Sequence, residues 1–160
     1  MPFLQSRDPG RKGRIRLDPR PAIMWHHATH IRVVRVHLVW STYRRQKWID
    51  RAWQERLYRC LREIGRRKGA LVLAVGGAPD HIHVYASLPT HTSVASLVDA
   101  LESNSSRWIH QTFPQLRLFA WQKGYSALSV CRRCEGVVIR YIRNQETHHG
   151  PTRKGGENES

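Results

Sequence analysis

Cysteines, acidic residues and long apolar runs are all scarce in this sequence of 160 residues. Its three cysteines are an odd number, so we expect no disulfide scaffold and we expect a reducing, cytoplasmic location. The longest apolar run, residues 71–75, is far shorter than the ~18 residues that a membrane-spanning helix requires. The sequence therefore predicts no membrane partner.

Two kinds of phosphate chemistry are disfavoured by what is missing. The pattern G-x-x-x-x-G-K-[ST], whose backbone cradles nucleotide phosphates, does not occur. Between residues 65 and 134 the only carboxylates are Asp80, Asp99 and Glu102. So few acidic ligands argue against a nuclease site that holds two metal ions.

Positive charge is present in excess. Lysine and arginine number 27 against 12 acidic residues, which gives a net charge of +15 and an isoelectric point near 11.0. Residues 1–24 carry +4 and residues 151–160 carry 0, so +11 falls on residues 25–150. We expect a disordered basic arm at 1–24, a single domain at 25–150 and a disordered tail at 151–160. The charge indicates a polyanionic partner.

The spacing of apolar residues predicts seven elements in the order β-α-β-β-α-β-α. Alternation with a period of two indicates strands, and spacings of three and four indicate helices. The strands are predicted at residues 29–40, 70–75, 81–87 and 125–130, and the helices at residues 51–68, from Thr92 or Ser93 to before Pro114, and at 134–149.

This order is typical of an α+β fold, the ferredoxin-like or RRM-like β-α-β-β-α-β antiparallel sheet, with an added C-terminal helix. The two crossover helices cover one face of such a sheet. In the third strand Ile82, Val84 and Ala86 would face those helices, which places His81, His83 and Tyr85 on the other face. We expect the last helix to cover that face.

Two groups of residues could carry chemistry. His81 and His83 are two apart in a strand, so both imidazoles can reach one metal ion. Tyr141 and Gln145 are one helical turn apart, and they offer a nucleophilic hydroxyl and a carbonyl ligand for a hard cation. Taken alone, the histidine pair is better explained as a solvated strand face, and the Tyr141 and Gln145 pair as an ordinary amphipathic helix. They support each other only if the last helix lies over the histidines.

The chain resembles the small single-tyrosine HUH transposases of bacterial insertion sequences, in which HUH denotes His-hydrophobic-His. The resemblance extends over ordered blocks from about residue 30 to residue 149. They read HLVWST at residues 37–42, GAPDHIHV at 77–84, NSSRWI at 104–109, WQKGYSALSV at 121–130 and YIRNQE at 141–146. Several ordered blocks are far more specific than His-x-His alone.

The resemblance implies a DNA transposase that acts on single-stranded DNA, usually through hairpin ends, and works as a homodimer. His81, His83 and Gln145 would hold Mg²⁺ or Mn²⁺. Tyr141, on the last helix, would attack a DNA phosphate, become joined to the 5′ phosphate and release a 3′-OH. The resemblance also shows a departure, because Glu102 and Ser103 stand where relatives often carry a lysine.

Basic residues near the shared blocks are the candidates for contacts with DNA phosphates. They are Arg44, Arg45, Lys47, Arg107, Arg132 and Arg133. The arginines of residues 51–68 are equally explained as the solvated face of a helix. Trp40 and Trp108 fall at core-facing spacings, so we expect them to pack in the interior.

Cys131 and Cys134 do not match a zinc site. The nearby His148 and His149 are adjacent, and adjacent helical residues diverge by about 100°. We interpret the two cysteines as small residues at the entrance of the last helix.

Two other functions stay open on the sequence. The chain could be a catalytically inactive or domesticated relative that acts as an RRM-like nucleic-acid-binding protein, although residues 81–87 offer only Tyr85 as an aromatic for base stacking. It could also be a phosphodiesterase in which the histidines activate water, and Tyr141 would then be dispensable.

Overall fold

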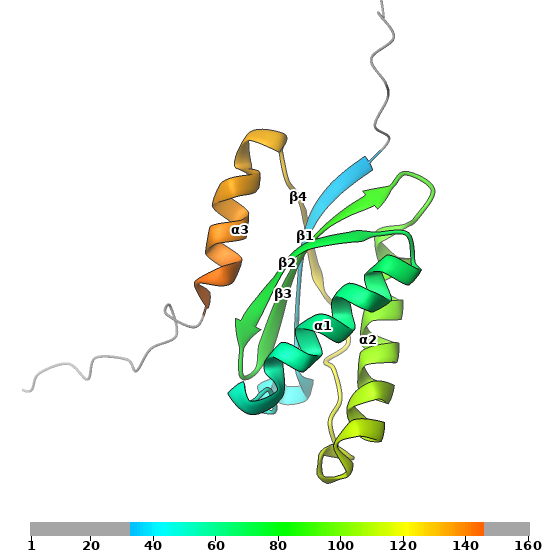
Figure 1. Ribbon diagram of the computed structural model, residues 1–160, viewed down its shortest axis with the longest axis vertical. Helices are drawn as coiled ribbons and strands as arrows, with labels where there is room; N and C mark the ends of the chain where they lie inside the picture. Colours follow the sequence, from blue (N-terminus) through cyan, green and yellow to red (C-terminus); the bar gives the residue numbers. More distant parts are fainter. Residues whose placement is uncertain (1–32, 146–160) are drawn as a thin grey trace, which may run out of the picture. The chain divides into compact units, whose positions relative to one another are not determined.

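A four-stranded antiparallel sheet forms the centre of the computed structural model, which describes residues 33–145 (Figure 1). The spatial order of the strands is β2-β3-β1-β4. The strands are β1 (Val33–Ser41), β2 (Leu71–Ala78), β3 (His81–Pro89) and β4 (Ser126–Ser129). The helices are α1 (Arg51–Arg67), α2 (Val94–Thr112) and α3 (Glu135–Arg143), with short 3-10 turns η1 (Tyr43–Arg45), η2 (Pro114–Leu116) and η3 (Arg132–Cys134).

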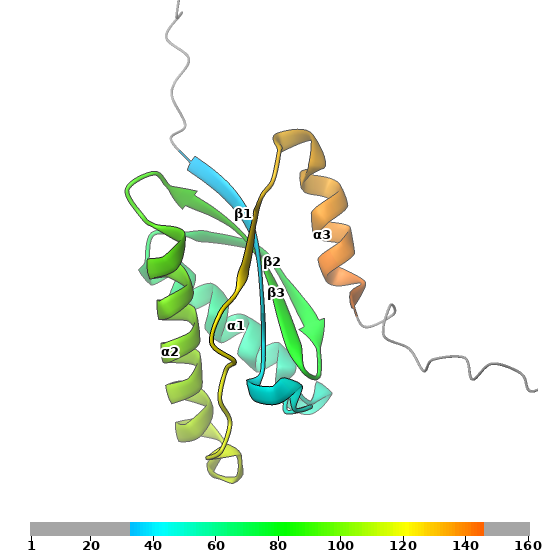
Figure 2. The same ribbon diagram turned by 180° about the vertical axis from the view of Figure 1, so that it is seen from behind.

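The helices cover the sheet from both sides. Figures 1 and 2 show α1 and α2 together on one face and α3 on the opposite face. The predicted α+β class, the element order and the added C-terminal helix are therefore confirmed. Within residues 33–145 no helix has the length and apolarity needed to cross a membrane.

Alternation within β1 and β3 separates the two faces. Val36, Leu38 and Trp40 join the main core with α1 and α2, and so do Ile82, Val84 and Ala86. The residues between them turn toward α3, where Tyr85 packs in a second, smaller core. The predicted assignment of β3 side chains to the two faces is thus confirmed. It follows from the pleat, which sends successive side chains to opposite sides.

Capping residues define where α1 and α2 begin. The Asp50 carboxylate accepts a hydrogen bond from the Ala52 amide at 2.7 Å, and the Ser93 hydroxyl accepts one from the Ser96 amide at 3.1 Å. Such caps satisfy amides that have no partner within the first helical turn. At the other end, Gly69 at φ 74° turns the chain out of α1 into β2.

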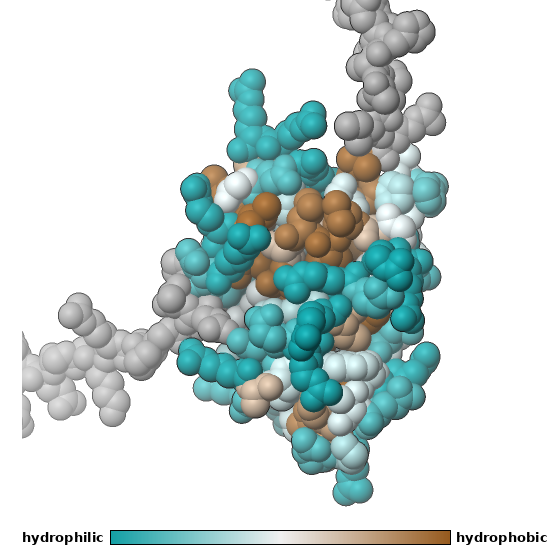
Figure 3. All heavy atoms as spheres, viewed as in Figure 1, coloured by the Kyte–Doolittle hydropathy of each residue, from teal (hydrophilic) through white to brown (hydrophobic). Residues whose placement is uncertain are grey.

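The helix α3 lies unusually close to β2. Ile142 is fully buried against Ala74 and Tyr85, and its backbone lies directly over Gly76. At the other end of α3, Glu135 forms an ion pair with Arg35 of β1. The helix is therefore fixed to the sheet at both ends. Figure 3, drawn in the view of Figure 1, shows hydrophobic residues at the surface in the upper middle of the molecule.

The clearest differences from the predicted boundaries are at the ends of β2 and α3. The strand β2 continues through Gly76 and Gly77 to Ala78, beyond the predicted end at residue 75, because both glycines keep pairing with β3. The helix α3 ends at Arg143, and residues 146–149 of the predicted helix lie outside the described residues. The predicted arm at 1–24, the start of the first strand at 29–32 and the tail at 151–160 lie outside them too.

Cys131 and Cys134 form a disulfide, which the sequence interpretation did not predict. The 3-10 turn η3 folds the chain so that the two Cα atoms lie 5.3 Å apart, within the usual range for a disulfide. The bridge joins residues at the entrance of α3, where we had expected two unconnected small side chains.

Gly76→Ala should loosen the docking of α3. A Cβ at position 76 would overlap the backbone carbonyl of Ile142, so either α3 or β2 must shift. Overpacking of this kind typically costs about 1–3 kcal/mol. We expect a lower melting temperature and faster hydrogen exchange of the α3 amides than in the wild-type protein.

Gly136→Ala, in the first turn of α3, is the matched control. A Cβ at position 136 would meet no atom within 4 Å, and alanine is better than glycine inside a helix by up to about 1 kcal/mol. We expect stability equal to or slightly above wild type. Equal destabilisation by both alanines would mean that the close approach at Gly76 is not what holds α3.

Glu102→Gln should change the pH dependence of stability. Burial, followed by the charge of Asp99, raises the pKa of Glu102 from 4.5 to about 7. The folded state then binds this proton more tightly than the unfolded chain, so stability falls as pH rises from about 4.5 to about 7. We expect the variant to melt above wild type at about pH 8 and together with it at about pH 4. A melting difference independent of pH would contradict this origin.

Candidate active site

An open cleft of about 540 Å³ brings together residues that are far apart in the sequence. Its lining includes His81 and His83 from β3, Tyr141 from α3, Gln145 just after α3, and Arg45 from η1. The condition set by the sequence, that the last helix lies over the histidine face, is met. All four candidate catalytic and metal-binding residues line one cleft.

The strand β3 directs both motif histidines toward this cleft. His81 and His83 are only 7% and 5% exposed, and their ring centroids are 5.1 Å apart. Ile82 between them is fully buried in the main core. The same stretch of strand therefore anchors the sheet on one face and presents two imidazoles on the other.

Each histidine ring is held by a hydrogen bond at Nδ1. His81 Nδ1 is 2.7 Å from Asp80 Oδ1, and His83 Nδ1 is 2.9 Å from His37 Nε2. Partners of this kind fix the orientation and tautomer of a histidine, as they do behind many metal ligands. His37 is itself 8% exposed, and burial lowers its pKa below the ordinary value.

Asp80 connects the motif to the basic turn that follows β1. Its carboxylate accepts from His81 and forms an ion pair with Arg45 at 3.0 Å. Partial burial opposes ionisation of Asp80, but the hydrogen bond from His81, its electrostatic attraction and the charge of Arg45 hold the pKa of Asp80 below the ordinary value. Asp80 is thus an acceptor, which assigns the donated proton to His81 Nδ1.

Tyr141 lies beside the histidines and reaches solvent. Its ring meets the ring of His83 edge-on at a centroid distance of 5.6 Å, and the side chain is 46% exposed. Gln145, one turn further, is 2% exposed, and its Nε2 donates to the backbone carbonyl of Tyr141 at 3.4 Å. An accessible phenol therefore borders two imidazoles and a buried amide.

The donors present suit a hard or borderline divalent cation. Within residues 33–145 no three side chains of His, Cys, Asp and Glu are grouped to hold a metal, and the Gln145 amide is the further donor that lines the cleft with His81 and His83. Two imidazole nitrogens and an amide oxygen form a mixed set that Mn²⁺ accepts well and Mg²⁺ accepts with lower affinity. The residues fit such an ion.

The six candidate DNA contacts are not all at this cleft. Arg45 lines it, and Arg44 precedes Arg45 in η1, where both residues adopt positive φ. Lys47 lines a neighbouring cleft with Gly77 and Pro79. Arg132 and Arg133 are exposed in η3, at the N-terminal end of α3. The cleft residue Gln145 lies at the opposite end of this helix. Of the six candidates, Arg45 therefore lines the cleft and the other five do not.

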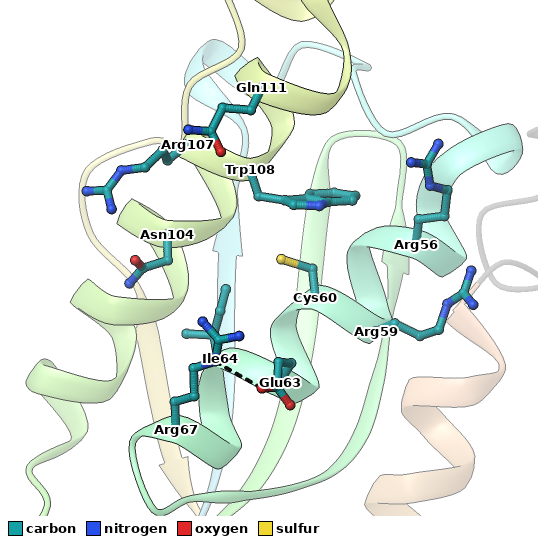
Figure 4. Close-up of a pocket in the computed structure, with 10 residues that line it drawn as sticks. All are labelled: Arg56, Arg59, Cys60, Glu63, Ile64, Arg67, Asn104, Arg107, Trp108 and Gln111. Carbon is teal, nitrogen blue, oxygen red and sulfur yellow. Dashed lines mark hydrogen bonds and ion pairs between the residues drawn. The ribbon is translucent and has the colours of Figure 1, made fainter.

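Arg107 lies on the other side of the sheet, in a groove between α1 and α2. Figure 4 shows this groove, of about 580 Å³, with Trp108 between the two helices and arginines along both. The guanidinium of Arg56 lies over the rings of Phe113 and Trp108, at 4.8 Å and 6.0 Å. The basic residues that line the groove are Arg56, Arg59, Arg67 and Arg107. The predicted packing of Trp40 is confirmed, and Trp108 is partly buried against the same core.

Sequence reasoning assigned no role to His37 or Asp80. His37 alternates with the core residues Val36 and Leu38 of β1 and so lies on the histidine face. Its contact with His83 depends on the register of β1 and β3, in which Val39 pairs with His83. Asp80 precedes the motif directly, so its adjacency to His81 was the available signal.

Comparison with known proteins identifies the family. The ISDra2 transposase TnpA of Deinococcus radiodurans is 27% identical over 114 residues, which span 68% of this chain and 81% of the relative. A solved candidate transposase from D. radiodurans R1 has a TM-score of 0.59 at 25% identity, covering 71% of this chain and 91% of that one. A REP-associated tyrosine transposase bound to a REP hairpin shares the fold, with a TM-score of 0.58 at 14% identity over 73% and 68% of the two chains. The profile of IS200-like transposases matches residues 30–145, and the chain belongs to this family of single-tyrosine HUH transposases.

Proposed function

We propose that this transposase cleaves and rejoins single-stranded DNA at the ends of an insertion sequence through a covalent 5′-phosphotyrosine at Tyr141. The observation that carries the proposal is the position of Tyr141, with its ring 5.6 Å from that of His83, in the cleft that His81 and Gln145 also line. The partial exposure of Tyr141 gives a DNA phosphate access to its hydroxyl.

The reaction exchanges one phosphate ester for another. The Tyr141 oxygen attacks the phosphorus and loses its proton to water, while the bond from phosphorus to the 3′ oxygen breaks and that oxygen takes up a proton. The 3′-OH of another strand can reverse the step at the phosphotyrosine. Because the ester bond is conserved, no nucleotide cofactor is needed, in keeping with a sequence that has no phosphate-binding glycine loop.

A phenol that keeps its proton is a weak nucleophile, so Tyr141 needs an activating group. His81, His83 and Gln145 would hold Mg²⁺ or Mn²⁺, which polarises the phosphate and offsets its charge. Arg45, which lines the same cleft, would bind and orient the neighbouring phosphate.

The arginine groove extends the DNA-binding surface to the second face of the sheet. The groove lies between α1 and α2, whereas the cleft lies under α3 on the opposite face (Figures 1 and 4). A DNA ligand that contacts both must fold around the sheet. We therefore infer a single-stranded ligand with a hairpin end; the REP-associated neighbour is bound to a REP hairpin.

A homodimer is consistent with the open side of the sheet. The strand β4 is the outer strand next to β1, all of its residues are exposed, and Leu128 presents 60% of its surface. An outer strand offers backbone groups that a second chain can pair with. We infer that two copies associate along this edge.

Tyr141→Phe tests the nucleophile. We expect the wild-type protein, incubated with single-stranded DNA and Mn²⁺, to form a protein–DNA adduct that survives denaturation, and we expect the variant to form none. Denaturing electrophoresis of labelled DNA measures both. An adduct with Tyr141→Phe would exclude Tyr141 as the nucleophile, and cleavage by the wild type without any adduct would favour hydrolysis by water.

His83→Ala serves as the companion variant in the same assay. We expect it to bind the DNA as the wild type does and to lose cleavage, because it retains every arginine named above. Equal loss of binding and cleavage would indicate damage to the fold. Binding without cleavage by the wild-type protein would support an inactive, DNA-binding relative.

Removing two groove arginines should weaken DNA binding mainly through electrostatics. Each phosphate contact contributes roughly 0.7–0.9 to the slope of log affinity against log salt. We expect the double variant Arg59→Gln/Arg107→Gln to lower this slope by roughly 1.5 for hairpin DNA, as measured by fluorescence anisotropy. The single variant Arg62→Gln is the control, because Arg62 is exposed on α1 but does not line the groove. An effect of Arg62→Gln as large as half that of the double variant would show that only net charge matters.

A further inference from the structure

His37 contacts two groups of the proposed active site without a role in the reaction described above. It lies on β1 beneath α3 and is 8% exposed. Its ring stacks on His83 with a centroid distance of 5.1 Å, and it meets the ring of Tyr141 edge-on at 6.1 Å. A buried polar ring between a proposed metal ligand and the proposed nucleophile calls for a physical account.

The hydrogen bond between the two histidines decides which nitrogen of His83 can bind a cation. His37 Nε2 and His83 Nδ1 are 2.9 Å apart, so one donates and the other accepts. A neutral imidazole has its proton on one nitrogen and its lone pair on the other. If His83 Nδ1 donates, its lone pair is at Nε2. If His37 donates instead, His83 carries its proton at Nε2 and that atom cannot bind a cation.

The tautomer of His81 follows from its own hydrogen bond. Its Nδ1 faces the carboxylate of Asp80 at 2.7 Å, and an ionised carboxylate only accepts. His81 therefore has its lone pair at Nε2. Both motif histidines line the same cleft, and each has its Nδ1 bonded to a group outside the His-x-His motif. If both rings are to bind the cation through Nε2, the proton of His83 must be on Nδ1, and His37 Nε2 must accept it.

We propose that His37 is a positioning residue that accepts the Nδ1 proton of His83 and thereby holds His83 in the tautomer whose Nε2 binds the divalent cation. The inference rests on the metal site of the proposed function. A partner behind a ligating histidine typically contributes 10–100-fold to metal affinity, as an order of magnitude. In this protein Asp80 serves His81, and a second imidazole serves His83.

The first test is a titration of the full-length protein with Mn²⁺ alone, without DNA, followed by electron paramagnetic resonance. We expect His37→Leu, which fills the buried space but accepts no proton, to bind Mn²⁺ roughly 10–100-fold more weakly than wild type. His37→Gln should restore most of the affinity, because its Oε1 can accept the same proton. Unchanged affinity in His37→Leu, or equal losses in the two variants, would overturn the proposal.

The second test reads the tautomer directly in the metal-free protein. Nitrogen-15 chemical shifts of the His83 ring distinguish a proton on Nδ1 from one on Nε2. We expect the Nδ1-protonated form in wild type and in His37→Gln, and a shift toward the Nε2-protonated form in His37→Leu. An Nε2-protonated His83 in the wild-type protein would contradict the proposal whatever the metal affinities are.

Two further variants separate this inference from the function on which it rests. His110→Leu is the matched control, since His110 of α2 also has its Nε2 in a hydrogen bond, 2.9 Å from the Phe119 carbonyl, but does not line the cleft. It should leave Mn²⁺ affinity unchanged. If His83→Ala also leaves the affinity unchanged, the proposed metal site itself is wrong. If His83→Ala lowers it and His37→Leu does not, only the role of His37 is wrong.

Discussion

The close packing of α3 on β2 is the contact on which the candidate active site depends. Tyr141 and Gln145 lie at and just after the C-terminal end of α3, which Ile142 anchors to the sheet. Ile142 can approach β2 closely because Gly76 has no side chain. At the other end an ion pair between Arg35 and Glu135 joins the start of the helix to β1. A phenol and an amide reach two strand histidines only while this helix keeps its position, so the geometry of the cleft is a consequence of helix docking.

The strand β3 joins stability and chemistry in consecutive residues. Ile82 and Val84 are fully buried under α1 and α2, while His81 and His83 face the cleft. A pleated strand held by neighbours on both sides has little freedom to rotate, so the two imidazoles are positioned by the core itself. The backbone fixes the position of each histidine Cα atom but not the orientation or the tautomer of its ring. Those depend on a hydrogen bond, and Asp80 and His37 supply one to each ring.

Much of this arrangement could be predicted from local patterns, and the remainder depends on distant contacts. The helix at 51–67, the faces of β3 and the added helix follow from periodicity, which is a property of neighbouring residues. The contact between His37 and His83 depends on strand register, and the groove that contains Arg107 depends on how α1 and α2 pair, so neither is readable from spacing. The disulfide of Cys131 and Cys134 depends on the turn η3, which carries no strong sequence signal.

The distribution of basic residues over both faces of the sheet constrains how DNA can be handled. Arg45 at the cleft is partly neutralised by Asp80, whereas Arg59 and Arg107 in the groove have no acidic neighbour among its lining residues other than Glu63. Glu63 is itself engaged by Arg66 and Arg67. Arg59 and Arg107 are therefore less neutralised by acidic side chains than Arg45 is. Under the proposed function, the groove would bind one segment of the DNA while the cleft acts on another. A change in the DNA segment at the groove would then alter binding, and a change in the segment at the cleft would alter cleavage. Each would have little effect on the other, because the sheet lies between the groove and the cleft.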